Sequence, residues 1–224
     1  MNTVVVSIGG SVVLSDESNG EFLRQLTRLL QKISTQYMLY VIVGGGRIAR
    51  RYIELGRELG FDEDTLDLIG IDVTRVNARI ITNLLKVSNR EIPHTTQEAL
   101  ALKLPIVVMG GTDPKHSTDL VGAELAETTH AIRFVNATNV DGIYDKDPNK
   151  FKDAKQLKEV PIKNLIQQYG TKWGMAGKNI FMDEPALEII RRARIPTFVV
   201  NGKRLDQLEK ALLGQPFDGT TILV

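Results

Sequence analysis

An apolar run that ends in glycines and then continues as a helix-like pattern occurs three times in this chain. The runs are Val4–Ile8, Val41–Val43 and Ile106–Met109, and each is followed at once by two or three glycines. β-Branched residues favour strands, and glycine allows the tight turn that leads into a helix. Because the first N–H groups of a helix lack internal partners, such a turn can bind an anion. Three turns of this kind indicate a ligand with several phosphates.

The order of strand-like and helix-like segments constrains the fold. Nearly continuous apolar strands that alternate with helices predict an α/β fold with a mostly parallel sheet, covered by helices on both faces. A long helix is expected from apolar residues spaced between Leu66 and Leu84, and Asn89–Pro93 breaks it. Ligands of such sheets bind outside the carboxyl ends of the strands, where the glycines lie. The expected strands are Val4–Ile8, Met38–Val43, Ile106–Met109, Ala131–Val135 and Thr197–Val200.

Composition excludes several classes of function. The chain has 224 residues and a net charge of +1, so it has no general attraction for nucleic acid or membranes. It contains no cysteine, which excludes disulfides, thiol nucleophiles and cysteine-ligated metals and fits the cytoplasm. Its apolar runs are much shorter than the ~20 residues of a membrane span. We therefore expect one cytoplasmic domain over residues 1–224, with no nucleic-acid or membrane partner.

The glycine turns match neither of two common nucleotide motifs. The P-loop pattern G-x-x-x-x-G-K-[ST] is absent, and Gly44–Gly46 does not complete G-x-G-x-x-G. For any one turn, a plain connection between strand and helix is an equally good interpretation. Arg47, Arg50 and Arg51 are expected in the first helical turn, where a positive charge opposes the helix dipole. A guanidinium placed there suits a phosphate, and the alternative is a solvated surface charge.

The loop from Gly110 to Asp119 combines a glycine turn with hydroxyls and a carboxylate. Ser117, Thr118 and Asp119 are each typical of a helix N-cap before the next helical pattern. The loop is longer than a cap requires, so it is also a candidate for binding a base edge or a phosphate. The simpler interpretation of His116 is an ordinary loop residue, and the alternative is a general base.

Taken in this order and spacing, the motifs resemble the amino acid kinase superfamily and, within it, the archaeal uridylate kinases. The resemblance runs nearly end to end, so motifs that are weak alone become specific together. It implies a three-layer αβα sandwich in which residues from about 1 to 135 bind the phosphate acceptor and those from about 136 to 224 bind ATP. The residues that carry it are Ile8-Gly9-Gly10-Ser11, Val43-Gly44-Gly45-Gly46-Arg47, Asp67 with Gly70, Gly110-Gly111-Thr112 through Ser117-Thr118-Asp119, Asn139-Val140-Asp141-Gly142-Ile143-Tyr144 with Asp147-Pro148, and Met182-Asp183.

The resemblance also implies a role for individual residues. UMP would contact Gly45, Asp67, Gly111, Thr112, Asp113, Pro114, Lys115, His116, Ser117 and Thr118. ATP would contact Gly9, Gly10, Gly46, Arg50, Thr138, Asn139, Tyr144 and Asp147. Catalytic roles would fall to Arg50, Lys178 and Asp183. Structural alternatives are a core aromatic for Tyr144, a plain turn at Asp147-Pro148 and a helix N-cap for Asp183.

One position departs from the superfamily pattern. Many members carry a lysine where this chain has Ser7, and that lysine neutralises the transferred phosphoryl group. The archaeal uridylate kinases resemble this chain at that position. The charge-stabilising cation is therefore unassigned, with Lys178 and Arg50 as candidates.

The implied reaction is transfer of the γ-phosphoryl group of ATP to UMP, giving UDP and ADP in pyrimidine nucleotide biosynthesis. The phosphate of UMP is already an anion near neutral pH, so no general base is required. Catalysis would rest on positioning and neutralising the two phosphates with glycine N–H groups, cations and Mg²⁺. Mg²⁺ would be held largely by ATP oxygens and water, and no protein metal ligand is assigned. UTP is a candidate inhibitor.

Two other functions are alternatives to UMP kinase activity. One is another kinase of this fold that acts on isopentenyl phosphate, carbamate or an acylamino acid. The isopentenyl phosphate kinases use a histidine near the acceptor glycine loop, where this chain has Arg47-Ile48-Ala49-Arg50. The other is a non-catalytic protein that binds a nucleotide or an oxyanion. The resemblance further implies a homohexamer, a trimer of dimers, with Leu66, Ile69 and Val73 on a candidate contact surface.

Overall fold

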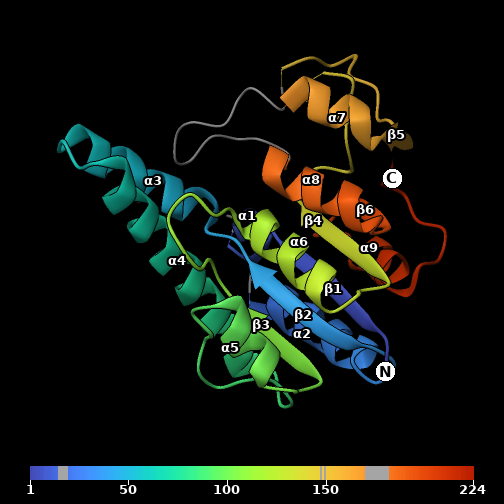
Figure 1. Cartoon of the computed structure of the whole chain (residues 1–224), viewed down its shortest axis with the longest axis horizontal. Helices are drawn as coiled ribbons and strands as arrows, with labels where there is room; N and C mark the ends of the chain where they lie inside the picture. The colour runs from blue at the N-terminus through green and yellow to red at the C-terminus, as the bar shows by residue number, and fades with distance from the viewer. Residues whose placement is uncertain (15–19, 147, 149, 170–181) are drawn as a thin grey trace.

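The computed structural model describes residues 1–14, 20–146, 148, 150–169 and 182–224. These residues form a seven-stranded sheet between two layers of helices (Figure 1). The strands are β1 (Thr3–Ile8), β2 (Met38–Val43), β3 (Ile106–Met109), β4 (Arg133–Thr138), β5 (Glu159–Pro161), β6 (Thr197–Asn201) and β7 (Thr220–Leu223). The helices are α1 (Gly10–Val13), α2 (Gly20–Ile33), α3 (Gly46–Glu58), α4 (Glu63–Leu84), α5 (Thr96–Ala101), α6 (Thr118–Thr128), α7 (Ile162–Tyr169), α8 (Glu184–Ala193) and α9 (Leu205–Leu213).

The sheet confirms the predicted mostly parallel α/β architecture. Its strand order is β3-β2-β1-β4-β6-β7-β5. The first five strands in this order are mutually parallel, and β7 pairs antiparallel with β6. Every residue of the central strand β1 is buried, because helices cover both of its faces. This double burial explains why the strand reads as a continuous apolar run instead of an alternating one.

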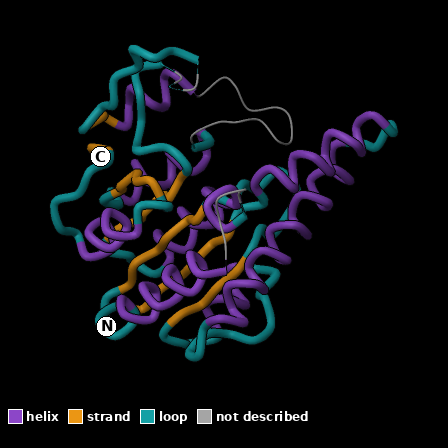
Figure 2. The backbone as a smooth tube through the Cα atoms, turned by 180° about the vertical axis from the view of Figure 1, so that it is seen from behind, coloured by secondary structure: helices purple, strands orange, loops and turns teal. Residues whose placement is uncertain are grey.

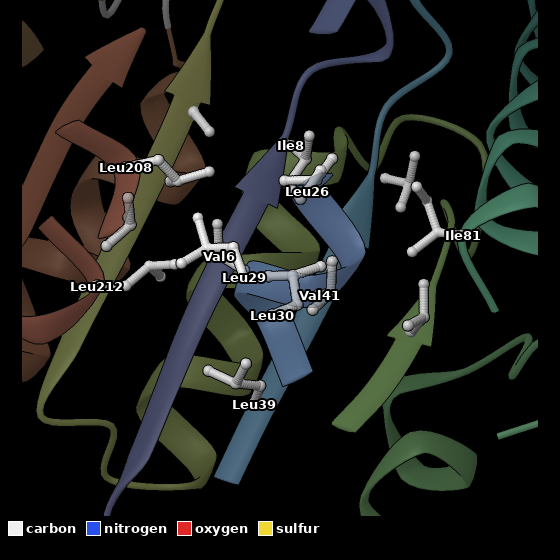
Figure 3. Packing of buried hydrophobic residues seen from close by; sticks show 14 of the residues in the cluster. Val6, Ile8, Leu26, Leu29, Leu30, Leu39, Val41, Ile81, Leu208 and Leu212 are labelled. Carbon is white, nitrogen blue, oxygen red and sulfur yellow. The ribbon is translucent and has the colours of Figure 1, made fainter. Parts of the chain in front are cut away.

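Two hydrophobic cores hold the layers together, one on each face of the sheet. On the first face, Leu26 and Leu30 of α2 pack over Val6 and Val41 of the sheet (Figure 3). Helices α4 and α9 complete this layer through residues such as Ile81. Helices α5 to α8 contribute to the core on the second face. Burying each such leucine stabilises the fold by about 2 kcal/mol before the entropy of ordering is subtracted.

A hairpin of α3 and α4 projects from the body of the molecule (Figures 1 and 2). Gly60 turns the chain between the two helices with a positive φ of 82°. The Asp62 side chain then caps α4 by accepting a 2.8 Å hydrogen bond from the N–H of Thr65. Leu66 is fully buried against Gly56 of α3, so the prediction that it lies on a contact surface is wrong.

Three details of the sheet and helices differ from the sequence predictions. The fourth strand is Arg133–Thr138 instead of Ala131–Val135, because its pairing with β1 extends it through polar Asn136 and Thr138. The edge strands β5 and β7, of three and four residues, are too short to give a hydrophobic pattern of their own. The long helix begins at Glu63, before the first predicted residue Leu66, because Asp62 caps it there; its end at Leu84 agrees with the prediction.

Candidate functional site

The three glycine turns meet at the carboxyl edge of the sheet. Strands β1, β2 and β3 are parallel neighbours, so the turns that follow them lie side by side. The backbone of Gly10 packs directly on Gly44–Gly46, where a Cβ on Gly10 would overlap main-chain atoms. Gly9 donates a 2.9 Å hydrogen bond to the carbonyl of Ala137, which places the end of β4 beside the same turns. The predicted ligand edge of the sheet is therefore one continuous surface.

Packing within the protein, and not a ligand, requires glycine at several positions of these turns. Gly110 faces Thr74 of α4 so closely that a Cβ would overlap the Thr74 hydroxyl. The same hydroxyl accepts a 2.7 Å hydrogen bond from the N–H of Gly111. The simple interpretation of these glycines as close-packed turns thus holds for Gly10, Gly44 and Gly110. It extends to Gly46, the first residue of α3, which has a positive φ of 68° and packs on the backbone of Gly10.

The arginines after the second turn divide into two kinds. Helix α3 starts at Gly46, so only Arg47 lies in its first turn, and the prediction that Arg50 and Arg51 do so is wrong. Arg51 is exposed and lies 3.9 Å from Glu54, which fits a surface charge. Arg50 is half-buried, and its guanidinium makes no ion pair or hydrogen bond within the described ranges. Of the three, Arg50 is the one available to a bound anion.

The structure brings Asp67 together with the loop after β3. The Oδ2 atom of Asp67 accepts a 2.8 Å hydrogen bond from the N–H of Lys115, a residue with a positive φ of 67°. The Lys115 ammonium reaches Asp64 at 3.0 Å. At the start of the loop, the guanidinium of Arg75 donates to the carbonyl of Thr112 at 3.1 Å. Helix α4 therefore fixes both ends of this loop.

Within the loop, backbone hydrogen bonds and caps account for several predicted residues. His116 donates its N–H to the carbonyl of Asp113 at 3.1 Å, which closes a turn around Pro114. Ser117 caps α6 by accepting from the N–H of Leu120 at 3.0 Å, as the N-cap interpretation requires. Thr118 is the first residue of α6. The His116 side chain is exposed, which favours a loop role over that of a general base.

Asp119 was not predicted as a site residue, and it lies in the first turn of α6, directly after this loop. Ser7 donates a 2.7 Å hydrogen bond to Asp119 in the first turn of α6. Burial of the carboxyl raises the pKa of Asp119 to about 7, with a smaller contribution from the charge of Asp183. Asp119 stands in the predicted loop from Gly110 to Asp119. Its hydrogen bond to Ser7 joins residues 112 positions apart, so no local sequence pattern could predict it.

Asp183 caps α8 and is also placed at the candidate site. Its Oδ1 atom accepts a 3.1 Å hydrogen bond from the N–H of Ala186, which confirms the N-cap interpretation. Its Oδ2 atom is buried and has no hydrogen-bond partner among the residues that the structure describes. Burial raises the pKa of Asp183, while Ser117 and the charge of His116 oppose the rise. One oxygen of this buried carboxylate is thus left for another partner.

The predicted ATP side is only partly described. Thr138 ends β4 beside Gly9, and its hydroxyl accepts a 3.0 Å hydrogen bond from the N–H of Val140. Asn139 is exposed, and Tyr144 is half-buried next to Gln156. Burial raises the pKa of the Tyr144 hydroxyl. Asp147 and Lys178 lie outside the described residues, so their roles stay predictions.

The described part of the chain contains neither a metal-binding cluster of side chains nor a membrane-spanning helix. No group of three or more His, Cys, Asp and Glu side chains there could hold a metal ion. None of the helices there is both long enough and apolar enough to span a bilayer.

Comparison with known proteins gives matches over nearly the whole chain. A model of the amino acid kinase family matches residues 2–201. The uridylate kinase of Methanobrevibacter smithii is 41% identical to this chain, and that of Methanothermobacter thermautotrophicus is 44% identical. Each match covers 98% of this chain and 98% of the relative. The crystal structure of the uridylate kinase from Archaeoglobus fulgidus is 37% identical, with a TM-score of 0.86 over 99% of this chain and 100% of the other.

Proposed function

Because the chain belongs to the amino acid kinase family, we propose that it is a UMP kinase, which transfers the γ-phosphoryl group of ATP to UMP. The products are UDP and ADP. The observation that carries this conclusion is the identity of 41% and 44% to uridylate kinases over 98% of the chain. The meeting of three glycine turns at one edge of the sheet supports it, since two nucleotides bring several phosphates to a single surface.

The acceptor UMP would bind between Asp67 and the loop that Asp67 holds. The carboxylate of Asp67 is half-buried and still has an oxygen free for a ribose hydroxyl while Oδ2 accepts from Lys115. Loop residues Gly111–Thr118 would enclose the base, and Gly45 would donate its N–H to the phosphate. These residues belong to the segment from about 1 to 135, which we propose as the acceptor half.

ATP would bind on the β4 side of the same edge, in the half from about residue 136 to 224. Thr138 and Asn139 follow β4 directly, and Tyr144 offers an aromatic ring to the adenosine. Gly9 and Gly10 lie between the two halves, because they contact both Ala137 and Gly44–Gly46. This position suits the phosphates that pass from donor to acceptor.

Catalysis would come from alignment and charge neutralisation, because the UMP phosphate is already a nucleophile near neutral pH. Arg50 is half-buried and unpaired within the described ranges, so its guanidinium can stabilise the transferred group. Mg²⁺ would be carried by the ATP phosphates and water, and would neutralise their charge. The free Oδ2 of Asp183 fits this arrangement as an acceptor for metal-bound water. Lys178 is the second candidate cation.

Exposed apolar residues on the α3–α4 hairpin support contacts with other copies of the chain, and the resemblance to uridylate kinases implies a homohexamer built from dimers. Tyr52 and Leu59 of this hairpin are 53% and 64% exposed, and Leu68 and Val76 of α4 are also exposed. A projecting apolar surface of this kind is typical of protein contacts. We place the enzyme in the cytoplasm and in pyrimidine nucleotide biosynthesis, with UTP as a candidate inhibitor.

A coupled assay of ADP formation tests the substrate. The purified chain is given ATP and one acceptor at a time: UMP, CMP, isopentenyl phosphate, acetylglutamate or carbamate. We expect kcat/KM for UMP to exceed that for the other acceptors by at least about 100-fold, because acceptor alignment decides the rate. Faster turnover of another acceptor would identify a different kinase of this fold. Nucleotide binding without ADP formation would identify a non-catalytic protein.

A further inference from the structure

One buried side chain of α4 controls the backbone of the second glycine turn. Asn77 is 1% exposed and lies on the face of the helix that packs against the sheet. Its Nδ2 atom donates to the carbonyl of Gly44 at 2.8 Å and to that of Gly45 at 3.4 Å. A single amide therefore holds two successive peptide groups.

The orientation of these peptides decides where their N–H groups point. In a trans peptide the carbonyl and the N–H of the next residue point in opposite directions, and the described chain has no cis peptide bond. With the carbonyls of Gly44 and Gly45 turned toward α4, the N–H groups of Gly45 and Gly46 point away from it. Neither N–H donates a hydrogen bond to any other described residue. Both therefore lack an acceptor within the described residues, which a bound phosphate would supply.

Packing alone does not require an asparagine here. Its neighbours on the buried face of α4 include Ala78 and Ile81, which are fully buried in the core. An amide at such a position is stable only when its hydrogen bonds are made. An aliphatic residue of similar size would avoid that desolvation cost but would remove the side-chain donor from both carbonyls, so that the Gly45 carbonyl would keep only its 3.5 Å hydrogen bond from the N–H of Ala49.

We propose that Asn77 is a positioning residue for phosphoryl transfer, which aims the N–H of Gly45 at the acceptor phosphate and that of Gly46 at the phosphoryl group being transferred. This inference rests on the proposed UMP kinase activity. Asn77 touches neither nucleotide; it acts through the two peptides that it holds. The hydrogen bonds of Asn77 go to the Gly44–Gly46 turn, where the phosphates would meet, and not to Thr138 or Tyr144 on the proposed adenosine side.

The test compares Asn77→Leu with Thr82→Val. Thr82 is on the same helix and is also buried, at 6% exposure, but its hydroxyl donates to the carbonyl of Arg79 within the helix. We expect Asn77→Leu to lower kcat/KM for UMP by about 100-fold, the typical loss for a misplaced oxyanion donor, while KM for ATP changes less than about threefold. Thr82→Val should change either constant by less than about threefold. Equal losses of kcat/KM for UMP in Asn77→Leu and Thr82→Val would overturn the proposal. Equal fold changes in KM for UMP and KM for ATP in Asn77→Leu would also overturn it.

Two further measurements keep the outcome unambiguous. Asn77→Asp preserves the side-chain volume but places a carboxylate against two carbonyl oxygens, so it should show the same selective loss if Asn77→Leu does not fold. A wild-type protein that leaves UMP unphosphorylated would refute the proposed function, not the role of Asn77. The crystal structure of the variant then decides: rotated Gly44 and Gly45 peptides support the inference, and unchanged peptides refute it.

Discussion

The hydroxyl of Ser7 donates a 2.7 Å hydrogen bond to the carboxylate of Asp119, where β1 meets the first turn of α6. The resemblance to the amino acid kinase superfamily implies a lysine at the position of Ser7 in many of its members. The position thus holds a neutral donor, and the carboxylate beside it has no cation of its own among the groups that shift its pKa. This arrangement has a consequence for the stability of the ligand-free protein.

The titration of Asp119 should make that protein less stable as the pH rises. Because burial raises the pKa of Asp119 from 3.8 to about 7, the folded state binds a proton that the unfolded state has lost between these values. The free energy of unfolding should therefore fall from pH 4 to pH 7. The full shift corresponds to at most about 4 kcal/mol, and solvent near the partly buried residue reduces it.

Urea unfolding of Asp119→Asn and wild type checks this at pH 5 and pH 8. Asparagine keeps the size of the side chain and cannot ionise. Relative to wild type, the variant should gain stability at pH 8 compared with pH 5. An equal difference at both pH values would show that Asp119 does not titrate in this range.

Asp67→Ala should weaken UMP binding far more than ATP binding. Asp67 fixes the acceptor loop through the Lys115 N–H, and we propose that it also contacts UMP. We expect KM for UMP to rise at least about tenfold, with KM for ATP within about twofold. Asp64→Ala is the matched control, since Asp64 reaches only the exposed ammonium of the same lysine at 3.0 Å. Similar effects of Asp64→Ala and Asp67→Ala on KM for UMP would contradict the assignment.

Tyr144→Ala should have the opposite selectivity. The half-buried ring is proposed to pack on the adenosine of ATP, so its loss should raise KM for ATP by about tenfold and leave KM for UMP nearly unchanged. Steady-state kinetics with each nucleotide varied in turn measures this. Tyr144→Phe keeps the ring and should behave like wild type. If Tyr144→Ala instead lowers thermal stability and changes both constants equally, the ring is a core aromatic.

A charge introduced on the α3–α4 hairpin should dissociate the proposed assembly. Leu59 is 64% exposed in the single chain, so Leu59→Glu costs little within the fold but buries a charge if the hairpin packs on another copy. Light scattering after size exclusion should show a loss of mass relative to wild type. Leu102→Glu, at a 38% exposed site after α5, is the control that should keep the wild-type mass. An unchanged mass for Leu59→Glu would remove the hairpin from the interface.

The central sheet was predictable because both of its faces are buried. Strands β1, β2 and β3 read as apolar runs that end in glycine, and their observed bounds agree with the predicted ones to within a residue. The predicted bounds of β4 lay too close to the N-terminus, because the carboxyl end of the strand is polar at Asn136 and Thr138. The edge strands β5 and β7 escaped prediction because segments of three and four residues carry almost no periodicity.

The site was predictable only in its local parts. Glycine turns and N-caps are properties of neighbouring residues, and the structure gathers the turns at the expected edge. The contacts of Ser7 with Asp119 and of Asn77 with Gly44 join residues 112 and 33 positions apart. Such pairs depend on the tertiary fold. A polar Asn77 among buried apolar positions of a helix was the available sign that it has a partner.

Transfer of label from [γ-³²P]ATP to unlabelled UMP tests the central claim most directly. We expect the purified protein with Mg²⁺ to form UDP labelled in its β-phosphate, in amounts equal to the ADP released. Label found only in inorganic phosphate, or remaining in ATP while UMP is bound, would contradict it.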